Sequence, residues 1–221
     1  MINIKFKYID LIKSIFYRSF IELLGTSILS IAIITSKDSS LSIVEGSIFI
    51  GLTLCFLIHL FGRTSGAHFN PLVTLMFMQL NHGSNWYKKK SLLIHSLLYI
   101  SFQLIGAIFV FKFYPLREID NALTSVNLLS EGLLTFIFLS LIKNWSEEGK
   151  VCPESKPLSG IVVGVGLIPI LIFGGLNTSG ILNPAIAIGM YFSGATGLTS
   201  ILFIEIVVLM MLYLTSKIKF Q

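Results

Sequence analysis

Long apolar stretches alternate with short polar ones along the whole chain, and six of the apolar stretches are long enough to cross a membrane. A transmembrane helix needs about 20 predominantly apolar residues. The six predicted spans are Ser19–Thr35, Ile43–Phe61, Ser91–Phe111, Val126–Ile142, Leu158–Phe173 and Leu198–Thr215. Because this many apolar side chains cannot be hidden in one soluble core, the pattern predicts an integral membrane protein.

Two shorter apolar segments lie in the gaps after the second and the fifth predicted span. Pro71–Leu80 and Pro184–Ser193 are each ten residues long. Ten helical residues extend about 15 Å, which is half the thickness of the hydrocarbon core. We therefore expect two re-entrant half-helices, each entering and leaving the membrane by the same side.

The two halves of the chain share polar landmarks. Glu22 and Thr26 in the first span have the same spacing as Glu131 and Thr135 in the fourth, and each half carries one Asn-Pro pair. Because each half has three spans, an odd number, the second half must run through the membrane in the opposite direction. An inverted repeat with broken helices is typical of a permeation site near the membrane midplane.

These landmarks predict an all-α membrane fold of six transmembrane helices and two re-entrant half-helices in an inverted 3+3 repeat. We expect a single domain over residues 1–221, with one repeat at about 19–111 and the other at about 126–215. Residues 1–18 mix basic with apolar side chains and are expected to form an amphipathic segment on the membrane surface.

Each Asn-Pro pair reads as the start of a helix. Proline suits the first helical position, where its missing N–H would have been unpaired, and the asparagine before it can cap a free N–H of the first turn. In an inverted repeat, Asn70-Pro71 and Asn183-Pro184 would meet in the middle of the membrane. Their side-chain amides and the positive ends of both half-helices would then face a permeating solute.

The basic residues predict the orientation. The side of the membrane that would hold both termini carries thirteen lysines and arginines, and the other side carries only Lys37, Lys112 and Arg117. Because positive residues concentrate on the cytoplasmic side, both termini are expected in the cytoplasm. The basic residues come in short runs rather than one stripe, so the net charge of +5 does not indicate a nucleic-acid partner.

Composition and motifs exclude several other classes of function. Only 12% of the residues are charged, and the mean hydropathy is +0.84. The sequence has no nucleophile elbow, phosphate loop or cluster of metal ligands, and Cys55 and Cys152 lack a metal-like spacing. We therefore expect no enzymatic activity, no cofactor and no metal site.

The two Asn-Pro pairs lie in sequence boxes that resemble those of the aquaporin, or major intrinsic protein, family. Ser65 to Pro71, with the sequence Ser-Gly-Ala-His-Phe-Asn-Pro, is similar to the first Asn-Pro-Ala box, with Leu72 in place of alanine. Asn183, Pro184 and Ala185 match the second box. The paired Glu-x-x-x-Thr motifs and Gln103 also fall at family positions. The resemblance weakens in the sixth span, which contains Glu205.

The resemblance implies roles for several further residues. Glu22 and Glu131 are expected to brace the re-entrant loops, and His68 to line the cytoplasmic vestibule. The family's four-residue selectivity filter falls on Ile50, Leu171, Gly180 and Ile186. Ile186 stands where the family usually has an arginine. The resemblance also implies a homotetramer with one pore per protomer.

From these features we expect a passive channel in the cell membrane for water and small uncharged solutes. A filter made of aliphatic side chains favours less polar solutes such as glycerol, undissociated metalloid acids or ammonia, because each lost hydrogen bond costs on the order of 1–3 kcal/mol. Three alternatives stay open: a strict water channel, a coupled secondary transporter, and a structural relative that conducts little. The bulky Leu72, Ile50, Leu171 and Ile186 make an occluded passage one of the outcomes to test.

Overall fold

The structure is a computed structural model that describes residues 2–38, 40–80, 86–114, 125–147, 150–177 and 181–194. The helices of this part are α1 (Ile2–Asp38), α2 (Ile43–Phe61), α3 (Pro71–Leu80), α4 (Trp86–Phe113), α5 (Ser125–Trp145), α6 (Ser159–Asn177) and α7 (Pro184–Phe192). The predicted sixth span, with Glu205 in it, and the filter position Gly180 lie outside the described residues.

The described helices confirm the predicted all-helical membrane fold. Within the described residues, four stretches are long and apolar enough to cross a membrane: Lys13–Lys37, Ile43–Phe61, Ser91–Phe113 and Ser159–Leu176. The fourth predicted span corresponds to α5, which has 21 residues. Both expected half-helices are present as α3 and α7, with ten and nine residues.

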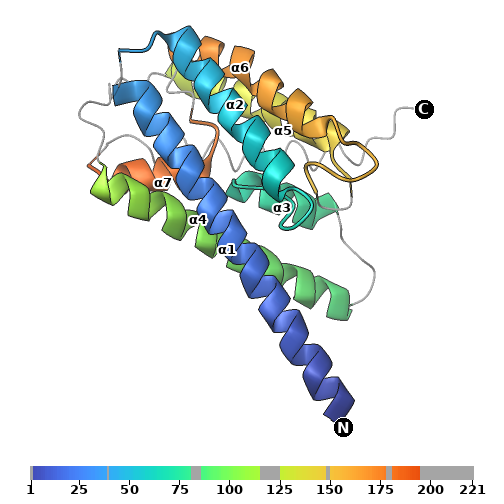
Figure 1. The fold of residues 1–221 in the computed structure, drawn as a ribbon. Coiled ribbons are helices and arrows are strands. Elements are labelled where there is room, and N and C mark those ends of the chain that lie inside the picture. Colours follow the sequence, from blue (N-terminus) through green and yellow to red (C-terminus); the bar gives the residue numbers. More distant parts are fainter. Residues whose placement is uncertain are drawn as a thin grey trace.

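The N-terminal segment continues directly into the first span. We expected residues 1–18 to lie on the membrane surface as a separate segment, whereas α1 runs without a break from Ile2 to Asp38. No glycine or proline occurs between Ile2 and Leu24, so the sequence contains no residue that would end the helix there. In Figure 1 this first half of α1 extends beyond the other helices.

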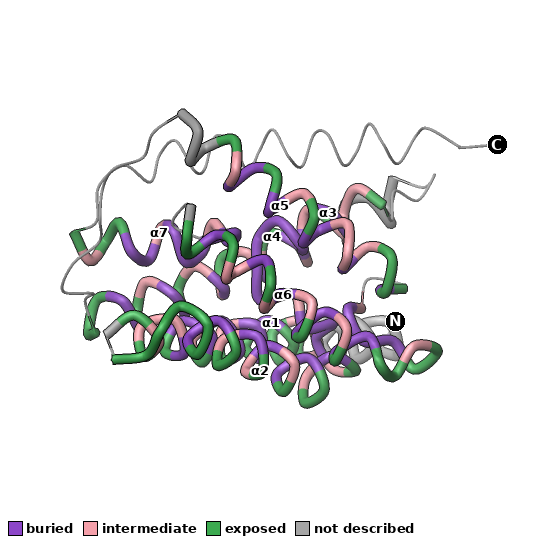
Figure 2. The backbone as a smooth tube through the Cα atoms, turned by 90° about the horizontal axis from the view of Figure 1, so that it is seen from above, coloured by how far each residue is buried: buried purple, intermediate pink, exposed green. Residues whose placement is uncertain are grey.

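The two half-helices pack against long helices: α3 contacts α4 and α5, and α7 contacts α4. Helix α1 packs against α2 and α4, while α6 packs against α2 and α5. The α2–α6 contact depends on Gly164, where a Cβ atom would lie 2.7 Å from the backbone nitrogen of Cys55. Helices α3 and α7 extend in opposite directions from the middle of the molecule, as both views show (Figures 1 and 2).

Burial is distributed as expected for a protein in lipid. Large apolar side chains such as Phe56, Leu97 and Phe109 are exposed. Along the described helices, exposed positions alternate with buried ones (Figure 2). Buried polar side chains lie inside, among them Glu22, Gln103 and Glu131, each fully buried. Since charged groups are costly in a membrane interior, carboxylates in such places need hydrogen-bond partners. These partners lie in the loops that lead into the half-helices.

Candidate functional site

Both half-helices begin at an asparagine. The Oδ1 atom of Asn70 accepts a hydrogen bond from the backbone N–H of Leu72 at 2.8 Å, and Oδ1 of Asn183 accepts one from the N–H of Ala185 at 3.0 Å. Pro71 and Pro184 occupy the first helical positions. Each Asn-Pro pair therefore caps its helix as the sequence chemistry predicts.

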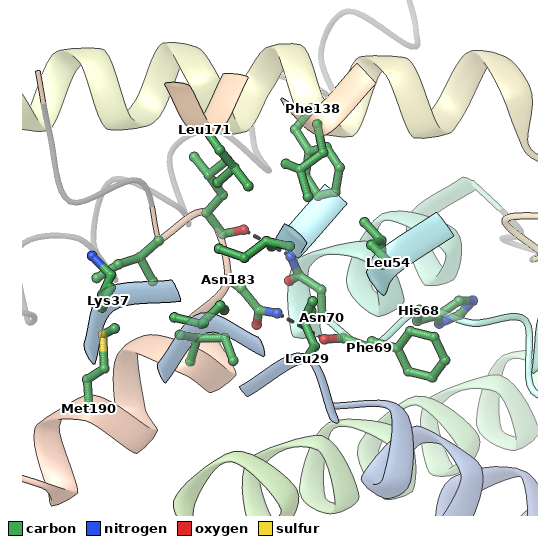
Figure 3. A pocket seen from close by; sticks show the side chains of 16 residues that line it. Leu29, Lys37, Leu54, His68, Phe69, Asn70, Phe138, Leu171, Asn183 and Met190 are labelled. Atoms are coloured by element: carbon green, nitrogen blue, oxygen red, sulfur yellow. Dashed lines mark hydrogen bonds between the residues drawn. The ribbon is translucent and has the colours of Figure 1, made fainter. Parts of the chain in front are cut away.

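The same two asparagines also join the half-helices to each other. Asn70 Nδ2 donates to the carbonyl oxygen of Leu182, and Asn183 Nδ2 donates to the carbonyl oxygen of Phe69, both at 2.9 Å (Figure 3). Each acceptor is the residue that precedes the other asparagine. The two helix N-termini, each with about half a positive charge, consequently lie against one another.

The two acceptor residues share an uncommon backbone conformation. Phe69 has φ 48° and Leu182 has φ 51°, in the left-handed region that non-glycine residues seldom adopt. Such a conformation costs on the order of 1–3 kcal/mol and persists only where the surroundings enforce it. Here it occurs at the equivalent position of both repeats, next to the carbonyl groups that receive the asparagine amides.

Glu22 stabilises the loop that precedes α3. Its Oε1 accepts hydrogen bonds from Ser65 Oγ at 2.6 Å and from the N–H of His68 at 3.1 Å. Its Oε2 accepts from the N–H of Phe69 at 2.7 Å and from Gln103 Nε2 at 2.8 Å. The carboxylate of α1 thus fixes the strained residue Phe69 and connects it to α4.

Glu131 has the equivalent position in the second repeat. Its Oε1 accepts hydrogen bonds from the N–H of Ile181 at 2.7 Å and from the N–H of Leu182 at 3.0 Å. Leu182 corresponds to Phe69 in the first repeat, and both are held by a fully buried carboxylate two spans earlier in the chain. Hydrogen bonds to a charged acceptor contribute about 1.5–3 kcal/mol each, enough to offset the strained backbone.

A cavity passes beside the two asparagines, and we call it the central cavity. It measures about 70 Å³, room for several waters or one small solute, since a buried water needs roughly 10–15 Å³. Its lining comprises Leu29, Ile33, Lys37, Ile50, Leu54, His68, Phe69, Asn70, Phe138, Leu167, Leu171, Ile181, Leu182, Asn183, Ile186 and Met190. In Figure 3, Asn70 and Asn183 lie near its middle, with Lys37 and His68 toward opposite ends.

Three of the four filter positions line the central cavity. Ile50 comes from α2, Leu171 from α6 and Ile186 from α7, and Ile186 is fully buried. Gly180 lies outside the described residues. The wall near these three side chains is aliphatic, without a hydrogen-bond donor at position 186.

Four residues of the two boxes do not line the cavity, and one of them, Pro184, is half-buried. Pro71, Leu72 and Ala185 are buried but absent from its wall. Leu72 packs instead in the apolar core of the described residues, where it is 2% exposed. The departure from alanine at this position therefore adds core packing and does not narrow the central cavity.

His68 lies between the central cavity and a second cavity of about 280 Å³, which we call the outer cavity. Its Nδ1 is 3.1 Å from Thr74 Oγ1, and its ring stacks on Phe77 with centroids 4.8 Å apart. Arg18, His95, Tyr99 and Lys150 are among the residues that line the outer cavity. His68 is thus fixed at the junction of the two spaces.

The sequence patterns missed several lining residues, most notably Lys37, Phe138 and Met190. A signal for Lys37 exists in its spacing, because Leu29, Ile33 and Lys37 follow one another at four-residue intervals on one face of α1. The same interval relates Ile186 to Met190 in α7. Among the described residues, no cluster of three or more histidine, cysteine, aspartate or glutamate side chains could hold a metal ion.

The described residues form an all-helical membrane fold, and two capped half-helices meet end to end beside a narrow cavity. These features place the protein among membrane proteins built on re-entrant helices. The sequence matches the family described as "Major intrinsic protein" over residues 12–202. The chain belongs to the major intrinsic protein family.

Individual relatives agree with this assignment. The chain is 27% identical over 152 residues to Nodulin-26 of Glycine max and 28% identical over 157 residues to Probable aquaporin NIP4-2 of Arabidopsis thaliana. Each match covers 64% of this chain and 52% of the relative, so the chain spans about half the length of these two proteins. It is 29% identical over 199 residues to Glycerol uptake facilitator protein-like 6 of Lactiplantibacillus plantarum, with 80% of this chain and 85% of the relative covered.

Proposed function

We propose that the protein is a passive transmembrane channel for small uncharged solutes such as glycerol, metalloid acids or ammonia, with slower passage of water. The observation that carries this proposal is the reciprocal pairing of Asn70 and Asn183 beside the central cavity. It brings two helix N-termini and two side-chain amides to one point of a largely apolar cavity wall.

The asparagine amides provide the polar contact for a solute. Each NH₂ group has two hydrogens, and one is used by the carbonyl of the opposite loop. The second hydrogen of each amide can donate to a water or hydroxyl oxygen that passes. Two adjacent positive helix ends also oppose cations and orient a file of water molecules against proton transfer.

The aliphatic filter favours solutes that lose little hydration. Water or a polar solute that passes Ile50, Leu171 and Ile186 finds no hydrogen-bond partner on these side chains, and each lost bond costs on the order of 1–3 kcal/mol. Glycerol can turn its carbon backbone toward these side chains, and undissociated acids and ammonia carry no charge, so these solutes pass an aliphatic wall at a lower cost than an ion does. The name of the L. plantarum relative, a glycerol uptake facilitator-like protein, supports the choice of solute.

The membrane arrangement forms part of the proposal. The charge distribution of the loops supports an orientation in the cell membrane with both termini on the cytoplasmic side. In that orientation His68 lines the cytoplasmic vestibule and Lys37 the opposite mouth. We further propose that four copies assemble as a homotetramer with one channel in each, and that the whole chain forms the single domain of two inverted repeats.

Stopped-flow light scattering on proteoliposomes tests the function. Water efflux under a sucrose gradient is compared with glycerol entry, with empty liposomes and an Asn183→Asp variant as controls. Glycerol entry well above that of empty liposomes, with modest water flux, supports the proposal. Fast water flux without glycerol entry would indicate a water channel. Flux that saturates and is driven by an ion gradient would indicate a coupled transporter. The absence of both water and glycerol flux would indicate a non-conducting relative.

A further inference from the structure

Lys37 brings a positive charge to one end of the central cavity. It lies in the last turn of α1 and lines the cavity together with Leu29 and Ile33, which occupy the same helix face. Eight residues separate Leu29 from Lys37, which corresponds to about 12 Å along the helix axis. Figure 3 shows Lys37 next to Met190, on the opposite side of the asparagines from His68.

Within the part of the chain that the structure describes, no direct contact neutralises the charge of Lys37. No described residue forms a hydrogen bond or an ion pair with its ammonium group, and the side chain is exposed at the cavity mouth. Glu131 acts on it electrostatically from a distance. The Oε1 atom of that carboxylate already accepts hydrogen bonds from Ile181 and Leu182. Lys37 is therefore available to a solute that enters from this end.

The rest of the cavity wall offers little polarity of its own. Among the described lining residues, Lys37 and His68 are the ionisable side chains, and Asn70 and Asn183 supply the amides. All other lining side chains are apolar. In a narrow apolar passage a single charge acts over a longer range than in water, because the surrounding medium has a low dielectric constant.

We propose that Lys37 is the charge-selecting residue of the channel, taking the place of the filter arginine that Ile186 does not provide. Its ammonium group repels cations at the mouth and donates hydrogen bonds to the oxygen atoms of neutral solutes. The solute then meets donors again at Asn183 and Asn70. This donor-only path selects uncharged solutes with hydroxyl oxygens and rejects small organic cations. The inference rests on the proposed channel function.

The test measures two permeabilities in the same proteoliposomes. Glycerol entry is followed by light scattering, and uptake of guanidinium, a small permanent cation, by a radioactive label. The variants are Lys37→Met, which keeps the side-chain length, Lys37→Gln as a second neutral variant, and Lys37→Arg, which keeps the charge. Lys112→Met is the matched control, because Lys112 is also exposed in the last turn of its helix but does not line the central cavity.

We expect the ratio of glycerol to guanidinium permeability to fall at least fivefold in both neutral variants. Removing a unit charge a few ångströms away changes the occupancy of that place by a cation by about this factor, even at the dielectric constant of water. Lys37→Arg and Lys112→Met should keep the wild-type ratio. An unchanged ratio in both neutral variants, or an equal fall in Lys112→Met, would overturn the role of Lys37 while leaving the channel function intact. A wild-type protein without glycerol or water flux above empty liposomes would overturn both.

Discussion

The side-chain amide of Asn183 donates a hydrogen bond to the carbonyl oxygen of Phe69, 2.9 Å away. Asn70 donates the equivalent hydrogen bond to the carbonyl oxygen of Leu182, so each asparagine side chain binds the loop that precedes the other half-helix. Each asparagine therefore caps its own helix with one end of the amide and holds the opposite loop with the other. This double use accounts for asparagine here. Aspartate could cap a helix but has no N–H to donate, and serine would have to accept and donate through one oxygen, whereas the asparagine amide has a separate acceptor and donor.

The first prediction concerns the coupling of these two asparagines. Asn70→Ala and Asn183→Ala each remove a cap, which costs about 1 kcal/mol, and leave a buried carbonyl unpaired, which costs about 1–3 kcal/mol. Each single variant should lower the melting temperature in detergent by several degrees. Because both bonds hold the same two loops together, the double variant should lose less than the sum of the single variants.

A cap elsewhere provides the control for this coupling. Ser42 caps α2 through the N–H of Glu45 and lies far from the junction in the chain. Ser42→Ala combined with Asn183→Ala should give an additive loss, as expected for independent sites. Additive losses in the Asn70/Asn183 pair as well would show that the two half-helices are held independently.

The second prediction concerns Glu22, which accepts four hydrogen bonds from two segments of the chain, the loop before α3 and helix α4. Glu22→Gln keeps the shape but replaces one acceptor oxygen with a donor, so at least one buried N–H loses its partner. We expect a loss of about 2–3 kcal/mol, or several degrees in melting temperature, together with reduced solute flux. Glu45→Gln alters an exposed carboxylate at the start of α2 and should leave both the melting temperature and the solute flux close to the wild-type values. Equal melting temperatures for Glu22→Gln and the wild type would exclude a bracing role.

The elements nearest to the site were predictable because their signals are local. An Asn-Pro pair fixes a helix start from two adjacent residues, and the starts of α3 and α7 at Pro71 and Pro184 follow from it. The repeated spacing marked Glu22 and Glu131 as equivalent positions of the two halves, and the structure finds both carboxylates fully buried. The Asn-Pro signal arises from chemistry within one helical turn, and the glutamate signal arises from matching positions in the two repeats.

The lining of the central cavity was harder to predict because it depends on how each helix is rotated. Phe138 and Met190 are apolar residues in apolar helices, and nothing local separates a cavity-facing side chain from a lipid-facing one. From the sequence, Lys37 was only counted among the basic residues on the side of the membrane opposite the termini. In the structure it belongs to the continuous helix α1 and lines the mouth of the central cavity. The sequence left open whether Leu72 narrows the passage, and in the structure this side chain packs in the apolar core.

The third prediction concerns the close approach of α1 to the first re-entrant loop. A Cβ atom on Gly25 would lie 2.0 Å from the ring of Phe69, which is fully buried and cannot swing away. Gly25→Ala should therefore displace Phe69 and weaken the hydrogen bond that its carbonyl accepts from Asn183. We expect a melting temperature several degrees lower and a severalfold loss of glycerol flux.

A second substitution separates this clash from a general effect of alanine. Phe69→Leu shortens the side chain that meets the new methyl group, so the double variant Gly25→Ala/Phe69→Leu should recover part of the flux lost by Gly25→Ala. Flux that remains as low in the double variant as in the single one would assign the defect to α1 itself rather than to the loop.

The last prediction tests the aliphatic filter at Ile186. This side chain is fully buried and lines the central cavity, whereas Ile188 in the same helix does not line it. Ile186→Ala should widen the passage and raise glycerol flux severalfold, and Ile188→Ala should leave the flux near the wild-type value. Ile186→Arg should cut glycerol flux and retain or raise the preference for water, because the guanidinium fills the passage and offers hydrogen bonds. Glycerol flux that is unchanged in both Ile186 variants would mean that solute selection takes place elsewhere along the cavity, since neither the volume nor the polarity of this position would then limit passage.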